Sequence, residues 1–299
     1  MILDFSPGGN QPSVHLATPA KVNLFLEIRA KRPDGYHELE TLMVPISLYD
    51  TLQFQMSPDS QLTLRCSHPD LGNPDENLVL RAARLLRDTV GITTGAQITL
   101  TKRIPLAAGL AGGSSDAAAT LVGLNRLWNL GLSRPQLLPL AQQLGSDIAF
   151  FLGDGAAWCT GRGEVITPCP VAIPLELVLV CPSFGMSTPA VYRALRVPAS
   201  PIDGTAIRAA VQQGDIDAIA QSLHNRLEEP AQTINPLLAD WLERLRNTNA
   251  TGVRMSGSGS TLFALCRDRT EATRVASAIA SEAGSVGAIS RVLLVRSCV

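Results

Sequence analysis

Residues 105–115 form a run of small and apolar residues that could close around an anion. With no bulky side chains in the way, consecutive backbone N–H groups can surround a phosphate, and a helix that begins near Ser115 would direct the positive end of its dipole to the same place. The run comprises Pro105, Leu106, Ala107, Ala108, Gly109, Leu110, Ala111, Gly112, Gly113, Ser114 and Ser115. Neither the Walker pattern nor the dinucleotide-binding pattern fits it, because no Lys follows the glycines and their spacing differs. The sequence therefore predicts an anionic ligand, the alternative being a tight helix entry without a ligand.

A second glycine loop, Ser256–Ser260, contains Ser256, Gly257 and Ser258 and lies between two apolar segments. Alone, this composition is typical of a hairpin turn. Two loops of this kind, one in each predicted domain, suggest that both line a shared cleft.

A cation and an amide, Lys21 and Asn23, stand two residues apart in an otherwise apolar segment. In a strand both side chains leave on the same face. A buried strand rarely carries both without a function, and the alternative is an exposed strand edge on which both are solvated.

Asp147 stands at the start of the apolar segment Ile148–Phe151. The positive end of a helix dipole and free N–H groups would keep its carboxylate ionised. The residue is therefore either a helix N-cap or a catalytic carboxylate. Tyr36 and His37 follow a turn at Arg32–Gly35, and such a pair taken alone is more often packing and surface than ligand contact.

Composition limits the classes of protein to which the chain can belong. Its 299 residues include 25 Lys and Arg against 26 Asp and Glu, for a net charge of -1, which disfavours a nucleic-acid-binding protein. The six scattered cysteines indicate thiols in a reducing compartment, and we predict no resident metal site. No leader-like segment or long apolar run is evident, so we expect a cytosolic protein without a membrane span.

Hydrophobic periodicity predicts an α/β chain of two domains, residues 1–168 and 169–299, divided at a proline cluster near Pro168. Extended segments with a turn between them are expected from Val14 to Phe54. Later helices are expected near Asn77–Val90, from about Ser115, from Ser133 to Leu144, and at Thr205–Gln213, Asp217–Leu223, Asn235–Arg246 and Thr270–Ala283. Later strands are expected at Ala96–Thr101, Leu175–Cys181, Gly252–Met255, Thr261–Arg267 and Val292–Arg296, with a hairpin over Ala156–Ile166.

Three segments resemble, in order and spacing, the motifs of the galactokinase, homoserine kinase, mevalonate kinase and phosphomevalonate kinase (GHMP) superfamily. They are Pro19–Leu24, the loop running from Pro105 to Ala119, and Ser256–Gly259. Within that superfamily, Arg32–His37 and Gly145–Asp147 are similar to the branch that phosphorylates 4-diphosphocytidyl-2-C-methyl-D-erythritol. The resemblance covers nearly the whole chain.

The resemblance implies a ribosomal-protein-S5-like N-terminal domain, a ferredoxin-like C-terminal domain, and transfer of a phosphoryl group from ATP to the 2-hydroxyl of that cytidine diphosphate compound. It implies that Pro105–Ser115 surrounds the ATP phosphates, with Ser114 and Ser115 nearest the phosphate and its Mg²⁺. Asp147 matches the catalytic aspartate and Lys21 its partner. Ala107 and Ala111 depart from the superfamily pattern, which is often richer in glycine there.

The remaining matched positions concern the alcohol substrate. The residues that the resemblance places against it are Asn23, Tyr36, His37, Thr188, Tyr192, Ser256, Gly257 and Ser258. Tyr36 and His37 match a clamp on the cytosine ring. The alternatives are another GHMP kinase, acting on mevalonate, homoserine or a sugar, and a nucleotide-binding protein without catalysis. We expect a monomer or a homodimer.

Overall fold

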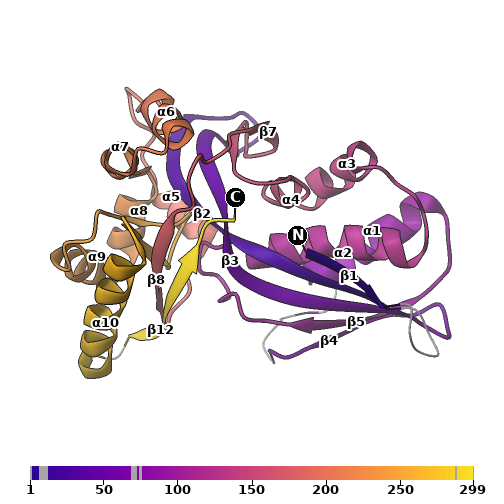
Figure 1. Ribbon diagram of the computed structural model, residues 1–299. Coiled ribbons are helices and arrows are strands. Elements are labelled where there is room, and N and C mark those ends of the chain that lie inside the picture. Colours follow the sequence, from indigo (N-terminus) through magenta and orange to yellow (C-terminus); the bar gives the residue numbers. More distant parts are fainter. Residues whose placement is uncertain (1, 7–12, 69–72, 74–75, 287, 299) are drawn as a thin grey trace. The chain divides into compact units, whose positions relative to one another are not determined.

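The computed structural model describes residues 2–6, 13–68, 73, 76–286 and 288–298 (Figure 1). The chain divides into two compact units, each made of separate segments. Unit 1 comprises Met1–Ala20, Leu48–Ile104 and Ala111–Asp154, and unit 2 comprises Lys21–Ser47, Pro105–Leu110 and Gly155–Val299. The predicted domain ranges 1–168 and 169–299 stay a prediction.

Two long strands, β2 (Ser13–Lys31) and β3 (His37–Met56), contribute residues to both units. Between them the chain turns at Arg32–Gly35, where the N–H of Arg32 donates to the carbonyl of Tyr36 at 2.8 Å. Gly35 has φ +85°, a conformation that glycine adopts without strain. The prediction of two extended runs joined by this turn is confirmed.

Unit 1 is a sheet with helices packed on it. The sheet follows the order β1 (Ile2–Ser6), β2, β3, β5 (Ala96–Thr101) and β4 (Leu62–Cys66). The helices are α1 (Leu78–Val90), α2 (Gly112–Leu127), α3 (Arg134–Leu144) and α4 (Ile148–Phe151), and Figure 1 shows α1 and α2 lying along one face of the sheet. Asn77 caps α1 by accepting the N–H of Val79 at 2.9 Å, so the helix begins where its sequence predicts.

Unit 2 contains a four-stranded antiparallel sheet in the order β10 (Gly252–Met255), β11 (Leu262–Cys266), β8 (Glu176–Pro182) and β12 (Ile289–Arg296). Helices α9 (Leu237–Asn247) and α10 (Arg269–Val286) contact this sheet, and Trp241 is 1% exposed in the core between them. The other elements of unit 2 are β6 (Ala157–Thr160), β7 (Val165–Pro168), α5 (Thr188–Ala194), α6 (Thr205–Gln213), α7 (Ile216–Ser222), β9 (His224–Asn225) and α8 (Glu228–Ile234).

The structure corrects the sequence-based boundaries in several places. Helix α2 begins at Gly112, three residues before the expected start near Ser115, because small residues already adopt helical geometry there. Strands β1 and β4 and helices α5 and α8 were not predicted. Among the described residues, no helix combines the length and the apolar character needed to cross a membrane.

Candidate active site

Lys21 and Asn23 are buried in unit 2, each 3% exposed, so the exposed-edge interpretation is wrong. The Lys21 ammonium donates to Asn23 Oδ1 at 2.6 Å and to the carbonyl of Gly109 at 2.9 Å. Asn23 Nδ2 donates to Thr41 Oγ1 at 2.7 Å, which fixes the orientation of its amide. A buried strand therefore presents an oriented cation beside the first glycine loop.

The first glycine loop is held by its carbonyl oxygens. The carbonyls of Ala107, Ala108 and Leu110 accept the N–H groups of Met186, Thr261 and Lys21, respectively. Residues 106 and 107 form a hydrogen-bonded turn, and within the described part of the chain the N–H groups of Leu106, Ala107, Gly109 and Leu110 donate no hydrogen bond to the protein. The loop thus keeps its donors for an anion, which is the donor chemistry that a phosphate requires.

Three residues of this loop have left-handed backbone conformations, with φ +48° at Ala107, +74° at Gly109 and +54° at Ala111. A Cβ on Gly109 would lie 2.1 Å from the carbonyl oxygen of Ser256, so only glycine allows the two loops to meet. The two alanines adopt a conformation that L residues rarely take, and the surrounding hydrogen bonds maintain it. The departure from the glycine-rich family pattern is therefore accommodated by local strain.

The second glycine loop connects β10 to β11, as the hairpin interpretation predicts, and it is also buried against the first loop. Ser256 Oγ donates to the carbonyl of Gly109 at 3.0 Å, and a Cβ on Gly257 would lie 3.2 Å from Lys21 Nζ. The Ser258 and Thr188 hydroxyls are 2.7 Å apart. Both loops and Lys21 therefore meet within unit 2.

The predicted base-binding aromatic residues fall into two contacts. His37 and Tyr192 lie with ring centroids 5.2 Å apart, whereas Tyr36 is 54% exposed and the Arg162 guanidinium lies 4.6 Å from the centroid of its ring. Burial, together with the charge of Lys31, lowers the pKa of His37, so its imidazole is neutral at pH 7. A neutral ring offers one donor and one acceptor nitrogen to a base.

In unit 1, Ser115 is fully buried at the first turn of α2. Its hydroxyl donates to the carbonyl of Pro19 at 2.6 Å and lies 2.5 Å from Thr18 Oγ1. Ser114 is half-buried. The contacts of both serines with a phosphate stay a prediction.

Asp147, also in unit 1, occupies the N-cap position of the four-residue helix α4, yet its side chain accepts no capping hydrogen bond. Within the described residues its carboxylate has no hydrogen bond or ion pair, and the residue is half-buried. The N-cap interpretation therefore does not account for this side chain. Lys21 and Asp147 belong to different units, and their pairing stays a prediction.

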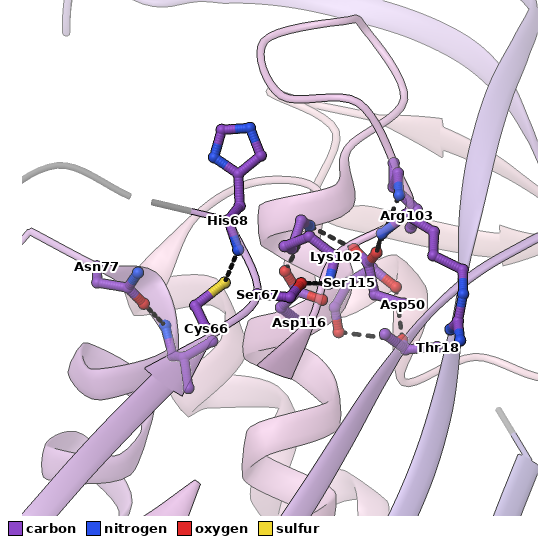
Figure 2. Close-up of polar contacts among 12 residues, drawn as sticks. Thr18, Asp50, Cys66, Ser67, His68, Asn77, Lys102, Arg103, Ser115 and Asp116 are labelled. Carbon is purple, nitrogen blue, oxygen red and sulfur yellow. Dashed lines mark hydrogen bonds and ion pairs between the residues drawn. The ribbon is translucent and has the colours of Figure 1, made fainter. Parts of the chain in front are cut away.

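Sequence reasoning missed a buried charge cluster of unit 1, formed by Asp50, Lys102 and Asp116 (Figure 2). The Lys102 ammonium is paired with Asp50 and, at 2.8 Å, with Asp116, and a Cβ on Gly112 would lie 3.1 Å from Lys102 Nζ. Burial raises the pKa of Asp116 to about 7, although Lys102 opposes that rise. The cluster lies at the first turn of α2, to which Asp116 belongs.

A second missed cluster lies in unit 2. Arg226 donates to both carboxylate oxygens of Glu27 at 2.7 Å, and His224 Nε2 lies 3.1 Å from Glu27 Oε2. Burial alone would raise the pKa of Glu27, but these hydrogen bonds, with those from the N–H groups of Ile202 and Ile28, lower it well below its usual value. The signal was present in the sequence, because residues 21, 23 and 27 share one face of the strand.

Two parts of this chain match a known protein family. The profile of the GHMP kinases N terminal domain matches residues 77–155, and that of the GHMP kinases C terminal domain matches residues 207–286. A protein of Pelotomaculum thermopropionicum named 4-diphosphocytidyl-2-C-methyl-D-erythritol kinase is 47% identical over 86% of this chain and 90% of its own. This chain belongs to the GHMP kinase family.

Other relatives of this GHMP kinase agree. The protein of the same name from Gloeobacter violaceus is 41% identical over 91% of this chain and 92% of its own. A crystal structure of 4-(cytidine 5'-diphospho)-2C-methyl-D-erythritol kinase superposes with a TM-score of 0.78 at 36% identity, covering 95% of this chain and 98% of that one. A homoserine kinase of Cytophaga hutchinsonii reaches the same TM-score at 20% identity, which shows the fold alone. The chain has the mixed α/β, two-domain GHMP kinase fold that its sequence predicted.

Proposed function

We propose that this GHMP kinase transfers the γ-phosphoryl group of ATP to the 2-hydroxyl of 4-diphosphocytidyl-2-C-methyl-D-erythritol. The observation that carries the proposal is the meeting of both glycine loops with the buried Lys21 ammonium, because an anion cradle beside an oriented cation suits phosphoryl transfer. The choice of substrate is taken from relatives that are 41–47% identical to this chain over the aligned residues and are named 4-diphosphocytidyl-2-C-methyl-D-erythritol kinase.

The transfer itself asks little covalent chemistry of the protein. The 2-hydroxyl oxygen forms a bond to the γ-phosphorus, the bond from that phosphorus to the bridging oxygen of ADP breaks, and the hydroxyl proton passes to the Asp147 carboxylate. Lys21 stabilises the negative charge that develops on the attacking oxygen, and Asn23 orients the substrate. N–H groups of Leu106–Leu110 hold the phosphates.

A Mg²⁺ ion accompanying ATP would neutralise phosphate charge. Of the two serines predicted to face it, Ser115 uses its hydroxyl on Pro19 within the protein. That contact supports Ser114 as the hydroxyl that faces the phosphate and the metal.

Specificity for a cytidine diphosphate group is proposed to come from the aromatic residues. The exposed Tyr36 ring offers a face for stacking on cytosine, and the neutral His37 imidazole can hydrogen-bond the edge of the base. Thr188 and Tyr192 are assigned to the erythritol part and to the base. The cytosolic location and the monomeric or homodimeric state stay predictions.

The deciding experiment is release of ADP from Mg-ATP with four acceptors in parallel: the diphosphocytidyl methylerythritol, methylerythritol phosphate, mevalonate and homoserine. We expect turnover with the first only. Turnover with mevalonate or homoserine would make the chain another GHMP kinase, and no turnover with any of the four would favour a nucleotide-binding protein without catalysis.

The role of Asp147 is tested by Asp147→Asn. Because a general base contributes about 10² or more in rate, we expect kcat to fall by at least that factor while the affinity for ATP is kept. Nucleotide titration of the variant is the control, and an Asn variant with wild-type kcat would rule out Asp147 as the base.

The role of Tyr36 is tested by Tyr36→Ala. Stacking on a base is worth roughly 1–3 kcal/mol, so KM for the cytidine substrate should rise about 5- to 150-fold with kcat nearly unchanged. A defect in kcat alone would contradict the clamp.

A further inference from the structure

Residues 224–228, with the sequence His-Asn-Arg-Leu-Glu, connect two segments of unit 2 that are far apart in the chain. Strand β9 (His224–Asn225) pairs in parallel with β2, with His224 opposite Phe25 and Asn225 opposite Leu26. The N–H of Arg226 continues this pairing by donating to the carbonyl of Leu26 at 2.8 Å. The segment is thereby fixed to the strand that carries Lys21 and Asn23.

Side chains from this segment extend the attachment in two directions. His224 and Arg226 both reach Glu27 of β2, whereas Asn225, which lies between them in the chain, reaches the second glycine loop. Because alternate residues of an extended segment face opposite sides, one short stretch of chain can contact both neighbours.

The Asn225 amide is fully used in its contact with the loop. Its Nδ2 group donates to the carbonyls of Met255 at 2.7 Å and Gly257 at 2.8 Å, and its Oδ1 accepts the N–H of Leu227 at 2.9 Å. The residue is 6% exposed. Two carbonyl acceptors and one N–H donor fit a carboxamide in a single orientation, and no other side chain of this size offers the same set.

We propose that Asn225 is a positioning residue for phosphoryl transfer, which holds the second glycine loop in register with the strand that carries Lys21 and Asn23. This inference rests on the proposed function and adds to it a residue that touches neither substrate. The loop that it holds matters because Ser256 Oγ and Lys21 Nζ share the Gly109 carbonyl as their acceptor. A displaced loop would change the surroundings of the Lys21 ammonium and the path of the first loop together.

The test is Asn225→Asp, which keeps the shape of the side chain but places a carboxylate oxygen against two carbonyl oxygens. Its matched control is Asn235→Asp in the same unit, where, among the described residues, the Asn side-chain oxygen accepts only the N–H of Leu237 at 3.2 Å and an Asp oxygen can do the same. Both variants add one negative charge, so a difference between them reports on the loop. Should Asn225→Asp fail to fold, Asn225→Ser retains one donor and carries the same test.

The first measurement is amide hydrogen exchange over residues 254–262. The loop N–H groups of Ser256, Gly259 and Thr261 donate to the carbonyls of Thr261, Ser256 and Ala108. We expect exchange at least 10-fold faster at these amides in the Asn225 variant, with α9 and α10 unchanged and with the control variant like the wild type.

The second measurement is steady-state kinetics at a temperature where the variant is fully folded. We expect kcat to fall about 10- to 100-fold, because a misplacement of about 1 Å has such effects. KM for the cytidine-bearing alcohol should change less than kcat, because the Tyr36 and His37 contacts are not altered even though the loop residues placed against this substrate move. A residue needed only for folding would lower the melting temperature and leave kcat of the folded fraction unchanged.

Loop exchange like that of the wild type would overturn the proposal, as would a wild-type kcat in a folded variant whose loop exchanges faster. If the wild-type chain itself turned over no acceptor, the proposed function would fail, whereas the exchange measurement would still decide whether Asn225 holds the loop.

Discussion

Each unit contains a buried charge cluster, and the two clusters differ in the ratio of acids to bases. In unit 2 a single carboxylate, Glu27, is met by the Arg226 guanidinium and the His224 ring. In unit 1 two carboxylates, Asp50 and Asp116, share the one Lys102 ammonium. The pKa of Glu27 is lowered and that of Asp116 is raised. Burial acts in the same direction on both, so the supply of donors decides the sign.

The excess of carboxylates in the unit 1 cluster is accompanied by one buried oxygen atom without a hydrogen bond. Among the described residues, Asp116 Oδ1 is a buried polar atom without a hydrogen-bond partner, while both oxygens of Glu27 accept from Arg226 and from backbone N–H groups. A protonated Asp116 would relieve the excess of negative charge. The comparison predicts that the unit 1 cluster depends on its one cation more than the unit 2 cluster depends on any one partner.

The largest expected effect comes from Lys102→Met. This change leaves two buried carboxylates without their cation, and breaking a buried pair typically costs 3–5 kcal/mol of the free energy of unfolding. Urea denaturation at pH 7 measures it. The control is Arg134→Met, whose ion pair with Asp154 is largely exposed and should contribute no more than about 1 kcal/mol. Equal effects of the two changes on the free energy of unfolding would contradict the predicted dependence of the unit 1 cluster on Lys102.

A smaller effect is expected from Glu27→Gln. The amide keeps one acceptor for the N–H groups but loses the charge that binds Arg226, so the free energy of unfolding should fall by about 2–3 kcal/mol at pH 7. Because the pKa of Glu27 is lowered in the folded state, this stabilisation is present above its usual pKa and disappears as the pH falls below about 4.5. A difference between wild type and variant that stayed constant down to pH 3 would contradict this assignment.

The test of sign is the pH dependence of Asp116→Asn. A carboxyl whose pKa is raised from 3.8 to about 7 keeps its proton in the folded state after the unfolded state has lost it, so the wild type loses stability as the pH rises through this range. The slope cannot exceed about 1.4 kcal/mol per pH unit. Denaturation series from pH 4.5 to 7.5 should show a less negative slope in the variant. The same slope in both proteins would show that Asp116 is ionised throughout.

Elements with local signals could be predicted from the sequence. Helix α1 has its Asn77 cap and its C-terminal Gly91, and β5 occupies the expected range Ala96–Thr101. The missed helices α5 and α8 have seven residues each, as does the predicted α7, but neither has a side-chain N-cap like the one that Asp215 gives α7. The two helices contact each other in unit 2.

The residues of the candidate site also divide into those with a local signal in the sequence and those without one. Lys21 and Asn23 could be singled out because two polar residues on one face of an apolar strand are a local pattern, but only the structure shows that they are buried. The Lys102 cluster could not be predicted, because its acids stand at positions 50 and 116 and no spacing in the sequence brings them together. Asn225 was missed for the same reason, since its partners Met255 and Gly257 lie 30 and 32 residues away.

The divided chain path of unit 2 has a consequence for biosynthesis. The carbonyl of Pro45 accepts the N–H of Cys298, and Ile46 forms a bridge with Ser297. At roughly 5–20 residues per second, a ribosome needs about 10–50 s to make the intervening stretch of about 250 residues. Throughout that interval β3 has emerged without Ser297 and Cys298, the residues that pair with Ile46 and Pro45. This part of unit 2 is therefore completed late in synthesis, and the end of β3 at Pro45 and Ile46 is open to chaperones until then.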